Sequence, residues 1–272
     1  MLIQIINYSV YYIGMMLTSN LKERLRSREL IFGSWVSFAH PSITEIFASH
    51  KFDFVAIDME HGTINLEQAQ RIIAASQYFK VPSLPRPVSH SNDWIKPLLE
   101  SGADGLIAPM VNSKSELQSL VNDLKYPPIG KRSFGVNRAQ GYGSNFDQYV
   151  GNWNKSSIFI AQIESKEAVQ DIDSIVSHPE LDGIMIGPYD LSGSLGVPGE
   201  KFHALVKEAE IKVIKACKDR GISCGTQLSD FNPDSVKNAL AMGYTFIIAS
   251  SDLFVLDAWA NNAEKVMQGF RK

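Results

Sequence analysis

The chain has 272 residues, of which 44% are hydrophobic and 20% are charged, a composition typical of a globular protein with enough apolar material for a core. The formal net charge is −3 and the sequence has no long basic run, which argues against a nucleic-acid-binding protein. This length fits one or two domains, and barrels of alternating strands and helices reach it as a single domain.

Residues 1–17 are rich in apolar side chains but contain no lysine or arginine. The segment is short for a membrane span and lacks the charged start of a secretory signal. We predict that residues 1–30 form an N-terminal extension with a leading helix, ahead of a domain at residues 31–272. We also expect translation to start at Met15 or Met16, because ordinary amphipathic sequence begins just after them.

Short apolar segments recur along the rest of the chain, and each is followed by sequence with helical periodicity. The predicted strands are Phe32–Ser37, Phe54–Asp58, Val81–Arg86, Gly105–Pro109, Ile158–Glu164, Gly183–Gly187, Ser223–Gln227 and Phe246–Ala249. The predicted helices are Ser42–His50, Leu66–Tyr78, Asn92–Ser101, Ser113–Leu124, Lys166–Val176, Phe202–Arg220, Pro233–Met242 and Leu253–Phe270. Eight strand–helix units without a compositional break predict an α/β fold, a single-domain (β/α)₈ TIM barrel. No G-x-G-x-x-G follows the first strand, which disfavours a dinucleotide-binding sheet.

The long stretch Tyr126–Trp153 is predicted to be irregular. It contains two adjacent prolines and several glycines, and a loop of this length inside a compact domain usually has a function. We expect it to lie between the fourth and fifth strands, over or beside the mouth of the barrel.

The two cysteines are predicted to be structural. Cys217 lies in a predicted helix and Cys224 in the strand that follows, with no C-x-x-C motif and no histidine at ligand spacing. Small buried apolar side chains explain both positions, and free cysteines fit a reduced, cytoplasmic protein.

The second predicted strand runs directly into a cluster of acidic and imidazole side chains. Asp58, Glu60 and His61 follow an apolar run that is typical of a strand buried on both faces. They fall at the carboxyl end of the strand, where α/β barrels assemble active sites. Asp58 is close enough in sequence to orient the His61 ring as a catalytic base. The alternative is a strand end whose histidine is solvated or caps a helix.

Three further strand ends also carry polar side chains. Arg86 stands between two prolines on an apolar strand, where a guanidinium needs an anionic partner. Gln162 and Glu164 alternate onto the same side of the fifth strand, and Asp190 follows the sixth. We expect these side chains to meet at one rim of the barrel.

Glu164 and Asp190 would suit Mg²⁺ or Mn²⁺, whereas zinc is disfavoured by the lack of a His/Cys cluster. Taken alone, either carboxylate is better explained as a helix cap or turn residue. The other histidines are interpreted as solvated or structural: His40, His50, His90, His178 and His203.

Four motifs occur in order at the ends of predicted strands. They are D-x-E-H-G after the second strand, L-P-R-P after the third, Q-I-E at the fifth and G-P-x-D-L-S after the sixth. Together they resemble the HpcH/HpaI family of metal-dependent, class II 2-oxo-acid aldolases, from about residue 32 to the C-terminal helix. The resemblance implies a (β/α)₈ barrel that cleaves a 4-hydroxy-2-oxo acid reversibly. The products would be an aldehyde and pyruvate or hydroxypyruvate, formed through a metal-stabilised enolate.

The resemblance also implies the catalytic roles. Glu164 and Asp190 would bind the divalent metal, Mg²⁺ or Mn²⁺, with Co²⁺ as a further candidate. Arg86 would stabilise the keto oxygen and the developing enolate. His61, oriented by Asp58, would be the acid and base.

The substrate-binding positions follow in the same way. Gln162 would line the pyruvate site, and the backbone N–H groups of Tyr189 and Asp190 would bind the substrate carboxylate. Gly187 and Pro188 would shape that turn.

Other features of the resemblance concern the surroundings of the site. Glu60 would lie behind the site, next to Arg86. Ser133 replaces a glycine that is usual in the family, and residues 137–143 would face the aldehyde, so the aldehyde is left open. Family members commonly form hexamers, and Leu253–Phe270 would pack either on a neighbouring subunit or on its own barrel. The partners would be a 2-oxo acid and an aldehyde, with no nucleic acid or membrane.

Two other functions are consistent with parts of the pattern. One is a lyase for a CoA thioester, of the citrate or malyl-CoA lyase type, which the D-x-E-H-G motif argues against. The other is a barrel retained as a binding module, which predicts an eroded site. A lysine Schiff base is disfavoured because no lysine lies at a core strand end.

Overall fold

The computed structural model describes residues 20–271. The expected translation start at Met15 or Met16 falls in residues 1–19 and lies outside the described residues. The strands are β1 (Ile31–Val36), β2 (Phe54–Asp58), β3 (Ser83–Arg86), β4 (Gly105–Ala108), β5 (Ile158–Ile163), β6 (Gly183–Ile186), β7 (Ser223–Leu228) and β8 (Phe246–Ala249). Each of the eight predicted strands is confirmed.

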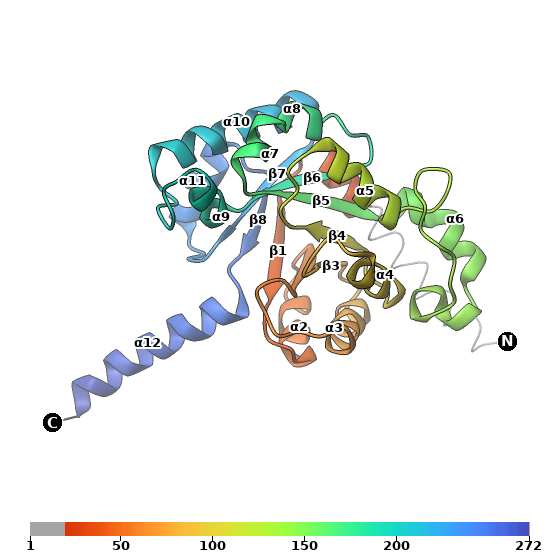
Figure 1. Ribbon diagram of the computed structural model, residues 1–272. Helices are drawn as coiled ribbons and strands as arrows, with labels where there is room; N and C mark the ends of the chain where they lie inside the picture. Colours follow the sequence, from red (N-terminus) through yellow and green to blue (C-terminus); the bar gives the residue numbers. More distant parts are fainter. Residues whose placement is uncertain (1–19, 272) are drawn as a thin grey trace.

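The strands form one parallel sheet in the order β3-β2-β1-β8-β7-β6-β5-β4. Its two outer strands, β3 and β4, contact each other at their N-terminal ends. The backbone N–H of Asp104 donates to the Ser83 carbonyl oxygen at 3.0 Å, and the Ser83 N–H donates to the Asp104 carboxylate at 2.9 Å. The sheet is therefore a nearly closed barrel surrounded by helices (Figure 1), which confirms the predicted (β/α)₈ fold.

The helices alternate with the strands along the chain. They are α2 (Pro41–Ala48), α3 (Leu66–Tyr78), α4 (Asn92–Glu100), α5 (Lys114–Leu124), the 3₁₀ helix η1 (Arg138–Gly143), α6 (Phe146–Ser156), α7 (Lys166–Gln170), α8 (Ile172–Ile175), α9 (Pro188–Ser194), α10 (Ala204–Arg220), α11 (Pro233–Met242) and α12 (Asp252–Phe270). Side-chain caps start several of them; Asn65, for example, accepts the N–H of Gln68 and forms a capping box.

The helix predicted at 166–176 is two helices. The break lies at Asp171, whose φ and ψ of −91° and 10° leave the helical region between α7 and α8. Its carboxylate accepts the backbone N–H of Lys114 at 3.0 Å, which ties the break to the start of α5. A long-range contact therefore interrupts a locally helical sequence.

The segment predicted to be irregular contains η1 and α6, so that part of the prediction is wrong. Its expected place at the mouth is also wrong. The Arg138 guanidinium donates to the Gln77 side-chain oxygen at 2.6 Å and to the Ser101 carbonyl at 2.9 Å. These acceptors lie where α3 and α4 end and the chain turns back into strands, at the floor of the barrel. In Figure 1, α6 lies on the opposite side of the molecule from α9 and α12.

The barrel interior is filled from its floor upward. Phe54 and Phe246 have ring centroids 6.4 Å apart. Both need glycine neighbours, because a Cβ at Gly33 would lie 2.3 Å from the Phe54 ring and one at Gly225 would lie 2.1 Å from the Phe246 ring. A helical segment at residues 20–26 covers the floor and buries Leu25 in the same cluster. The mouth at the carboxyl ends of the strands is left for polar side chains.

Within the described part of the chain, no helix has both the length and the apolar character needed to cross a membrane. The split of the chain at residue 30 stays a prediction.

Candidate active site

Arg86 is at the centre of the polar side chains that line the mouth. It ends β3, directly beside Asp58 at the end of β2. Its Nε and Nη2 donate to Asp58 Oδ1 at 3.0 and 2.9 Å. Its Nη1 lies 3.1 Å from Glu60 Oε2, and the guanidinium lies 4.7 Å above the Trp35 ring. Arg86 is only 6% exposed, so these contacts fix a positive charge at the strand ends.

The carboxylate of Asp58 has contacts that differ from those expected. Besides Arg86, its Oδ1 accepts the backbone N–H groups of Glu60 at 3.2 Å and His61 at 3.3 Å. The carboxylate therefore holds the turn after β2, and it contacts the backbone of His61 instead of the ring. The ring lies beside Glu60, with Nε2 at 3.7 Å from Glu60 Oε2, and the His61 side chain is 61% exposed. The structure thus brings Glu60, and not Asp58, next to the imidazole.

Glu164 is held in place from two sides. Its Oε2 accepts the side-chain N–H of Gln162 at 2.7 Å, and its Oε1 accepts the backbone N–H of Met110 at 2.8 Å. Met110 has a φ of 48°, the left-handed region that non-glycine residues seldom adopt. The Gln162 side-chain oxygen in turn accepts from Arg86 Nη1 at 3.4 Å. The ends of β3 and β5 are thereby joined in one hydrogen-bonded network.

The Glu164 carboxylate occupies space that a side chain at residue 187 would fill. A Cβ at this position would lie 2.3 Å from Glu164 Oε2 and 3.0 Å from Gln162 Nε2. Pro188 then begins α9, in which the N–H of Leu191 bonds the Gly187 carbonyl at 3.0 Å. Asp190 lies in the first turn of α9 and is exposed. A glycine predicted to shape a turn therefore also makes space for a carboxylate.

The carboxylates at the mouth repel one another. The pKa of Glu164 is raised to about 7, mainly by burial; the negative charges of Glu60 and Asp190 add to the effect, whereas the Met110 N–H and Arg86 oppose it. Burial also raises the pKa of Glu60, with Asp58 and Asp190 adding to the effect and Arg86 and His61 opposing it. The mouth thus holds more negative charge than Arg86 alone offsets.

This charge distribution fits a hard divalent cation. Oxygen donors are the ligands that Mg²⁺ and Mn²⁺ prefer. Glu60 Oε2 forms an ion pair with Arg86 but is buried without accepting a well-aligned hydrogen bond from the described residues. No group of three or more His, Cys, Asp or Glu side chains within the described chain is arranged as a metal site. The predicted metal ligands, Glu164 and Asp190, are only two carboxylates and so do not make up such a group.

Two contacts of the site were not predicted. Trp35 lies under the Arg86 guanidinium, and Met110 donates to Glu164. The alternation of β1 would have indicated an inward Trp35, because Gly33 and Trp35 share a face of the strand. The backbone conformation of Met110 has no signal in the residue type.

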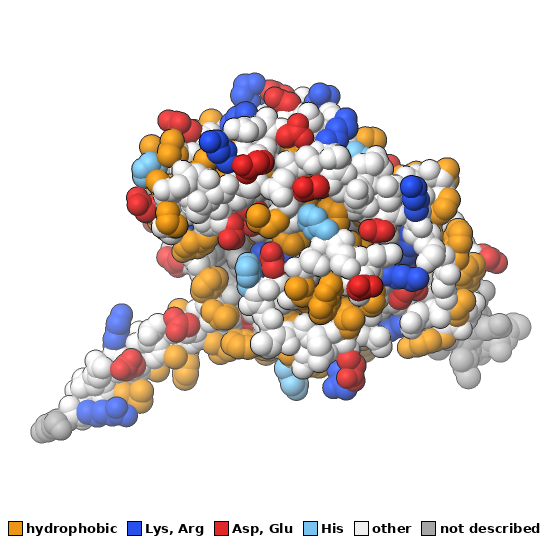
Figure 2. Space-filling view, viewed as in Figure 1, with side chains coloured by type: hydrophobic (Ala, Val, Ile, Leu, Met, Phe, Trp, Pro, Cys, Tyr) orange, Lys and Arg blue, Asp and Glu red, His pale blue; other side chains and the backbone are white. Residues whose placement is uncertain are grey.

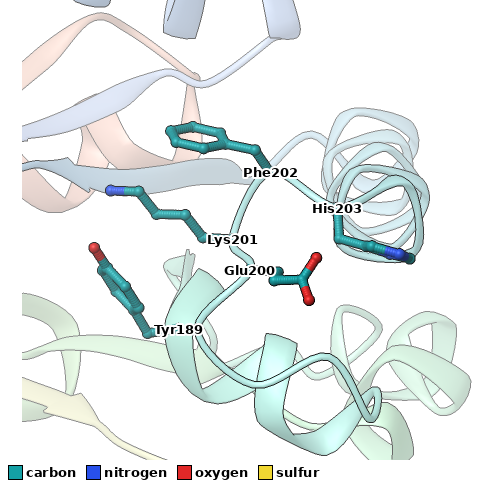
Figure 3. A pocket seen from close by; sticks show the side chains of 6 residues that line it. Tyr189, Glu200, Lys201, Phe202 and His203 are labelled. Atoms are coloured by element: carbon teal, nitrogen blue, oxygen red, sulfur yellow. The ribbon is translucent and has the colours of Figure 1, made fainter.

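An open pocket of about 550 Å³ lies between α9 and the start of α10. It is lined by Tyr189 of α9 and by residues 199–203, which precede α10 (Figure 3). Tyr189 connects the pocket to the turn that carries Asp190.

Comparison with known proteins gives a consistent result. Residues 32–257 match the family model described as HpcH/HpaI aldolase/citrate lyase. A 2-keto-3-deoxy-L-rhamnonate aldolase from Escherichia coli is 33% identical over 239 residues, which cover 87% of this chain and 88% of the relative.

Two solved structures extend the likeness to the fold. An HpcH/HpaI aldolase from Desulfitobacterium hafniense is 27% identical with a TM-score of 0.84, over 91% of this chain and 96% of that one. An HpcH/HpaI aldolase/citrate lyase family protein from Burkholderia cenocepacia is 28% identical with a TM-score of 0.86, over 92% and 99%. These matches confirm the resemblance drawn from the four strand-end motifs. The chain belongs to the HpcH/HpaI aldolase/citrate lyase family and is a carbon–carbon lyase, a class II pyruvate-type aldolase.

Proposed function

We propose that this aldolase cleaves a 4-hydroxy-2-oxo acid into an aldehyde and pyruvate or hydroxypyruvate, with Glu164 and Asp190 as the metal ligands. Aldolases of this family generally depend on a divalent metal. The observation that carries the proposal is the buried network in which Arg86 contacts Glu60 and Gln162, and Gln162 holds Glu164. The charges of Glu60 and Asp190 act on Glu164, whose pKa is raised to about 7 mainly by burial, and a bound cation would relieve that repulsion.

The oxygen donors of Glu164 and Asp190 favour Mg²⁺ or Mn²⁺ over zinc, and Co²⁺ is a further candidate. When bound, the cation supplies Lewis-acid stabilisation for negative charge on the 2-oxo oxygen. Gln162 and the Met110 N–H keep the Glu164 carboxylate in one position. Such hydrogen bonds to a ligand orient it and tune its affinity for the ion.

Arg86 provides the fixed positive charge of the reaction. Cleavage of the C3–C4 bond leaves its electron pair on the pyruvate fragment, and negative charge grows on the former keto oxygen. Arg86 is already oriented by Asp58 and Trp35, so it needs no rearrangement to stabilise that charge. A preorganised donor of this kind contributes about 100- to 1,000-fold to the rate.

His61 is the proton-transfer group in this proposal. Its neutral imidazole takes the proton from the 4-hydroxyl, and the oxygen electrons form the aldehyde carbonyl as the C3–C4 bond breaks. A proton returned to C3 completes pyruvate. Glu60, 3.7 Å from the ring nitrogen, stabilises the protonated ring and takes the role first expected of Asp58.

The substrate carboxylate binds at the start of α9. The backbone N–H groups of Tyr189 and Asp190 belong to the first turn, where helical N–H groups have no acceptor within the helix. Gln162 lines the same site next to Arg86. Gly187 and Pro188 keep the turn open toward Glu164.

The test is release of pyruvate, coupled to lactate dehydrogenase, first from 2-keto-3-deoxy-L-rhamnonate. We expect turnover to be lost after exhaustive chelation and recovered with Mg²⁺, Mn²⁺ or Co²⁺. Glu164→Gln should stay inactive after the metal is returned. Activity that survives chelation would reject the metal site, and trapping with borohydride would then identify a lysine adduct. Acyl-CoA substrates test the thioester alternative, and we expect them to be inert.

We also propose that the protein assembles with copies of itself, as a hexamer. Helix α12 projects away from its own barrel (Figure 1), and apolar side chains lie along it (Figure 2). Among its exposed residues are Leu253, Leu256, Trp259, Val266 and Phe270. This arrangement favours packing on a neighbouring subunit over packing on its own barrel.

A cytoplasmic location is part of the same proposal. Cys217 and Cys224 are both free and buried, as expected for a protein that folds in a reducing compartment.

A further inference from the structure

We infer that His90 is a positioning residue for the metal ligand Glu164 and acts on it through a single peptide group. The inference rests on the proposed function, in which Glu164 binds the cation, and adds a residue that lies outside the four strand-end motifs. His90 belongs to the loop between β3 and α4, on the mouth side of the barrel. Its ring is partly buried, and its Nε2 lies 2.5 Å from the Pro109 carbonyl oxygen, just after β4.

The peptide group between residues 109 and 110 connects the two side chains. A carbonyl oxygen can only accept a hydrogen bond, so Nε2 of His90 carries the hydrogen and donates it to the Pro109 carbonyl. The nitrogen of the same peptide group belongs to Met110, whose N–H donates to Glu164 Oε1 at 2.8 Å. A donor at the carbonyl polarises the peptide group and strengthens the hydrogen bond made by its N–H. His90 therefore controls both the orientation and the donor strength of the group that holds Glu164.

This peptide group needs support because of the backbone conformation that follows it. Met110 has a φ of 48°, a left-handed conformation that a non-glycine residue keeps only where its surroundings fix it. Asn112 provides one restraint, since its side-chain N–H donates to the Met110 carbonyl oxygen at 2.9 Å. That bond acts after Met110, whereas His90 holds the carbonyl before it. Without His90, the peptide group is free to rotate away from Glu164.

The contact also lies at the seam of the barrel, between β3 and β4. These strands are the two ends of the sheet order, and they lie side by side in Figure 1. The backbone of Ser83 faces Asp104 at the floor, and Pro85, two residues farther along β3, faces the same way but has no N–H to donate. Within residues 20–271, no backbone hydrogen bond joins β3 to β4 nearer the mouth. The side chain of His90 makes the connection there.

The experiment compares replacements of His90 that keep or remove its donor. His90→Gln places an amide N–H near the position of Nε2, whereas His90→Asn is shorter and places it near that of Nδ1. His90→Ala removes the donor altogether. The matched control is His50→Ala, because the exposed His50 also contacts a backbone carbonyl, that of Ile46 at 2.6 Å, at the end of α2.

Three measurements separate positioning from catalysis. Hydrogen–deuterium exchange of the metal-free enzyme, resolved with overlapping fragments around Met110, reports on the peptide group in the absence of metal and substrate. Isothermal titration calorimetry gives the Kd for Mn²⁺. Pyruvate release at saturating Mn²⁺ gives kcat.

In His90→Ala and His90→Asn we expect the Met110 N–H to exchange faster, by about fivefold for one lost hydrogen bond. The Kd for Mn²⁺ should rise about tenfold, the lower end of the effect of residues that orient a metal ligand. Most of kcat should return at saturating Mn²⁺, because His90 contacts the backbone and no reacting group. His90→Gln and His50→Ala should behave as wild type.

Other results overturn the inference in distinguishable ways. Faster exchange at Met110 with unchanged Mn²⁺ affinity would show that the peptide group does not position Glu164. Equal effects of His90→Gln and His90→Ala would reject the hydrogen bond, and a kcat that stays low at saturating Mn²⁺ would make His90 part of the reaction itself. Wild type that binds no Mn²⁺ rejects the proposed metal ligands as well, whatever the exchange shows.

Discussion

At the scale of single residues, the site depends on a few close contacts around Glu164. Its carboxylate fits only because residue 187 has no side chain, and Gln162 and Met110 fix its two oxygens. The contacts that hold Glu164 are therefore as specific as the carboxylate itself. Small substitutions at these contacts test the site without removing a reacting group.

Gly187→Ala is the most direct of them. The added Cβ would lie 2.3 Å from Glu164 Oε2, so the carboxylate must move, and misplacement of this order costs about 100-fold in rate. We expect kcat/KM to fall by that factor while far-UV circular dichroism is unchanged. Gly193→Ala, in the helix α9 that Gly187 precedes, is the control because its Cβ would meet nothing within 4 Å. Equal activity of the two variants would contradict the role of Gly187.

His61 allows catalysis and metal binding to be separated. In His61→Ala we expect kcat to fall by about 100- to 10,000-fold, because a positioned acid–base group contributes that much. The affinity for Mn²⁺, followed by isothermal titration calorimetry, should change little, because the proposed ligands are Glu164 and Asp190. Parallel loss of activity and Mn²⁺ affinity would place His61 among the ligands.

At the scale of elements, a strand or helix could be predicted from the sequence where its burial produces a regular apolar pattern. The strands were predictable because a parallel strand is apolar on both faces, as in Phe54–Asp58. Helix α6 was not, although Phe146, Tyr149, Val150 and Trp153 have helical spacing, because glycine and asparagine surround it. Helix α9 has only seven residues, too few for a periodic signal.

The same distinction applies to the site: which strand ends meet could be predicted, but the contacts between individual side chains could not. Convergence of Arg86, Gln162, Glu164 and Asp190 follows from topology, since the carboxyl ends of parallel strands meet at one edge. The exchange of partners between Asp58 and Glu60 depends on side-chain geometry, which strand periodicity does not describe. Residues 137–143 were placed at the wrong end because loop length says nothing about the direction in which a loop folds.

The buried Lys125 links the end of α5 to the end of α6 and gives a pH-dependent prediction. Its Nζ donates to the Ser157 hydroxyl at 2.8 Å and lies 3.2 Å from a Glu180 carboxylate oxygen. Burial lowers its pKa from 10.5 to about 8, with the charge of Lys22 adding to the effect. The unfolded chain therefore binds more protons between pH 8 and 10.5, and deprotonation favours the folded state.

We expect the free energy of unfolding of wild type, relative to Lys125→Met, to increase as the pH rises through this range. The shift corresponds to at most about 3 kcal/mol. Urea titrations at pH 7.5, 8.5, 9.5 and 10.5 measure it, and the difference between the two proteins removes the effects of other groups. A difference that stays constant with pH would show that the Lys125 pKa is the same in the folded and unfolded chains.

At the scale of the whole molecule, α12 is the element that the single chain leaves without a partner. Its Trp259 is 69% exposed and its Phe270 85%, far from the apolar core. Its start is nevertheless firmly attached, because the Asp252 carboxylate accepts the backbone N–H groups of Ser37 and Phe38, each at 2.9 Å. A rigidly anchored helix with an exposed apolar face is suited to dock on another copy of the chain.

Trp259→Glu should therefore convert the assembly to smaller species. Burying a glutamate in an apolar contact costs several kcal/mol unless it finds a partner. Light scattering coupled to size-exclusion chromatography gives the mass, and we expect that of a hexamer for wild type and less for the variant. The control is Lys265→Glu, which adds negative charge to the same helix without removing an apolar side chain.

Because α12 starts at the end of β8, beside the mouth, the activity of the dissociated variant also shows whether one barrel suffices for catalysis. Full activity in a monomer would mean that the assembly has no part in forming the site.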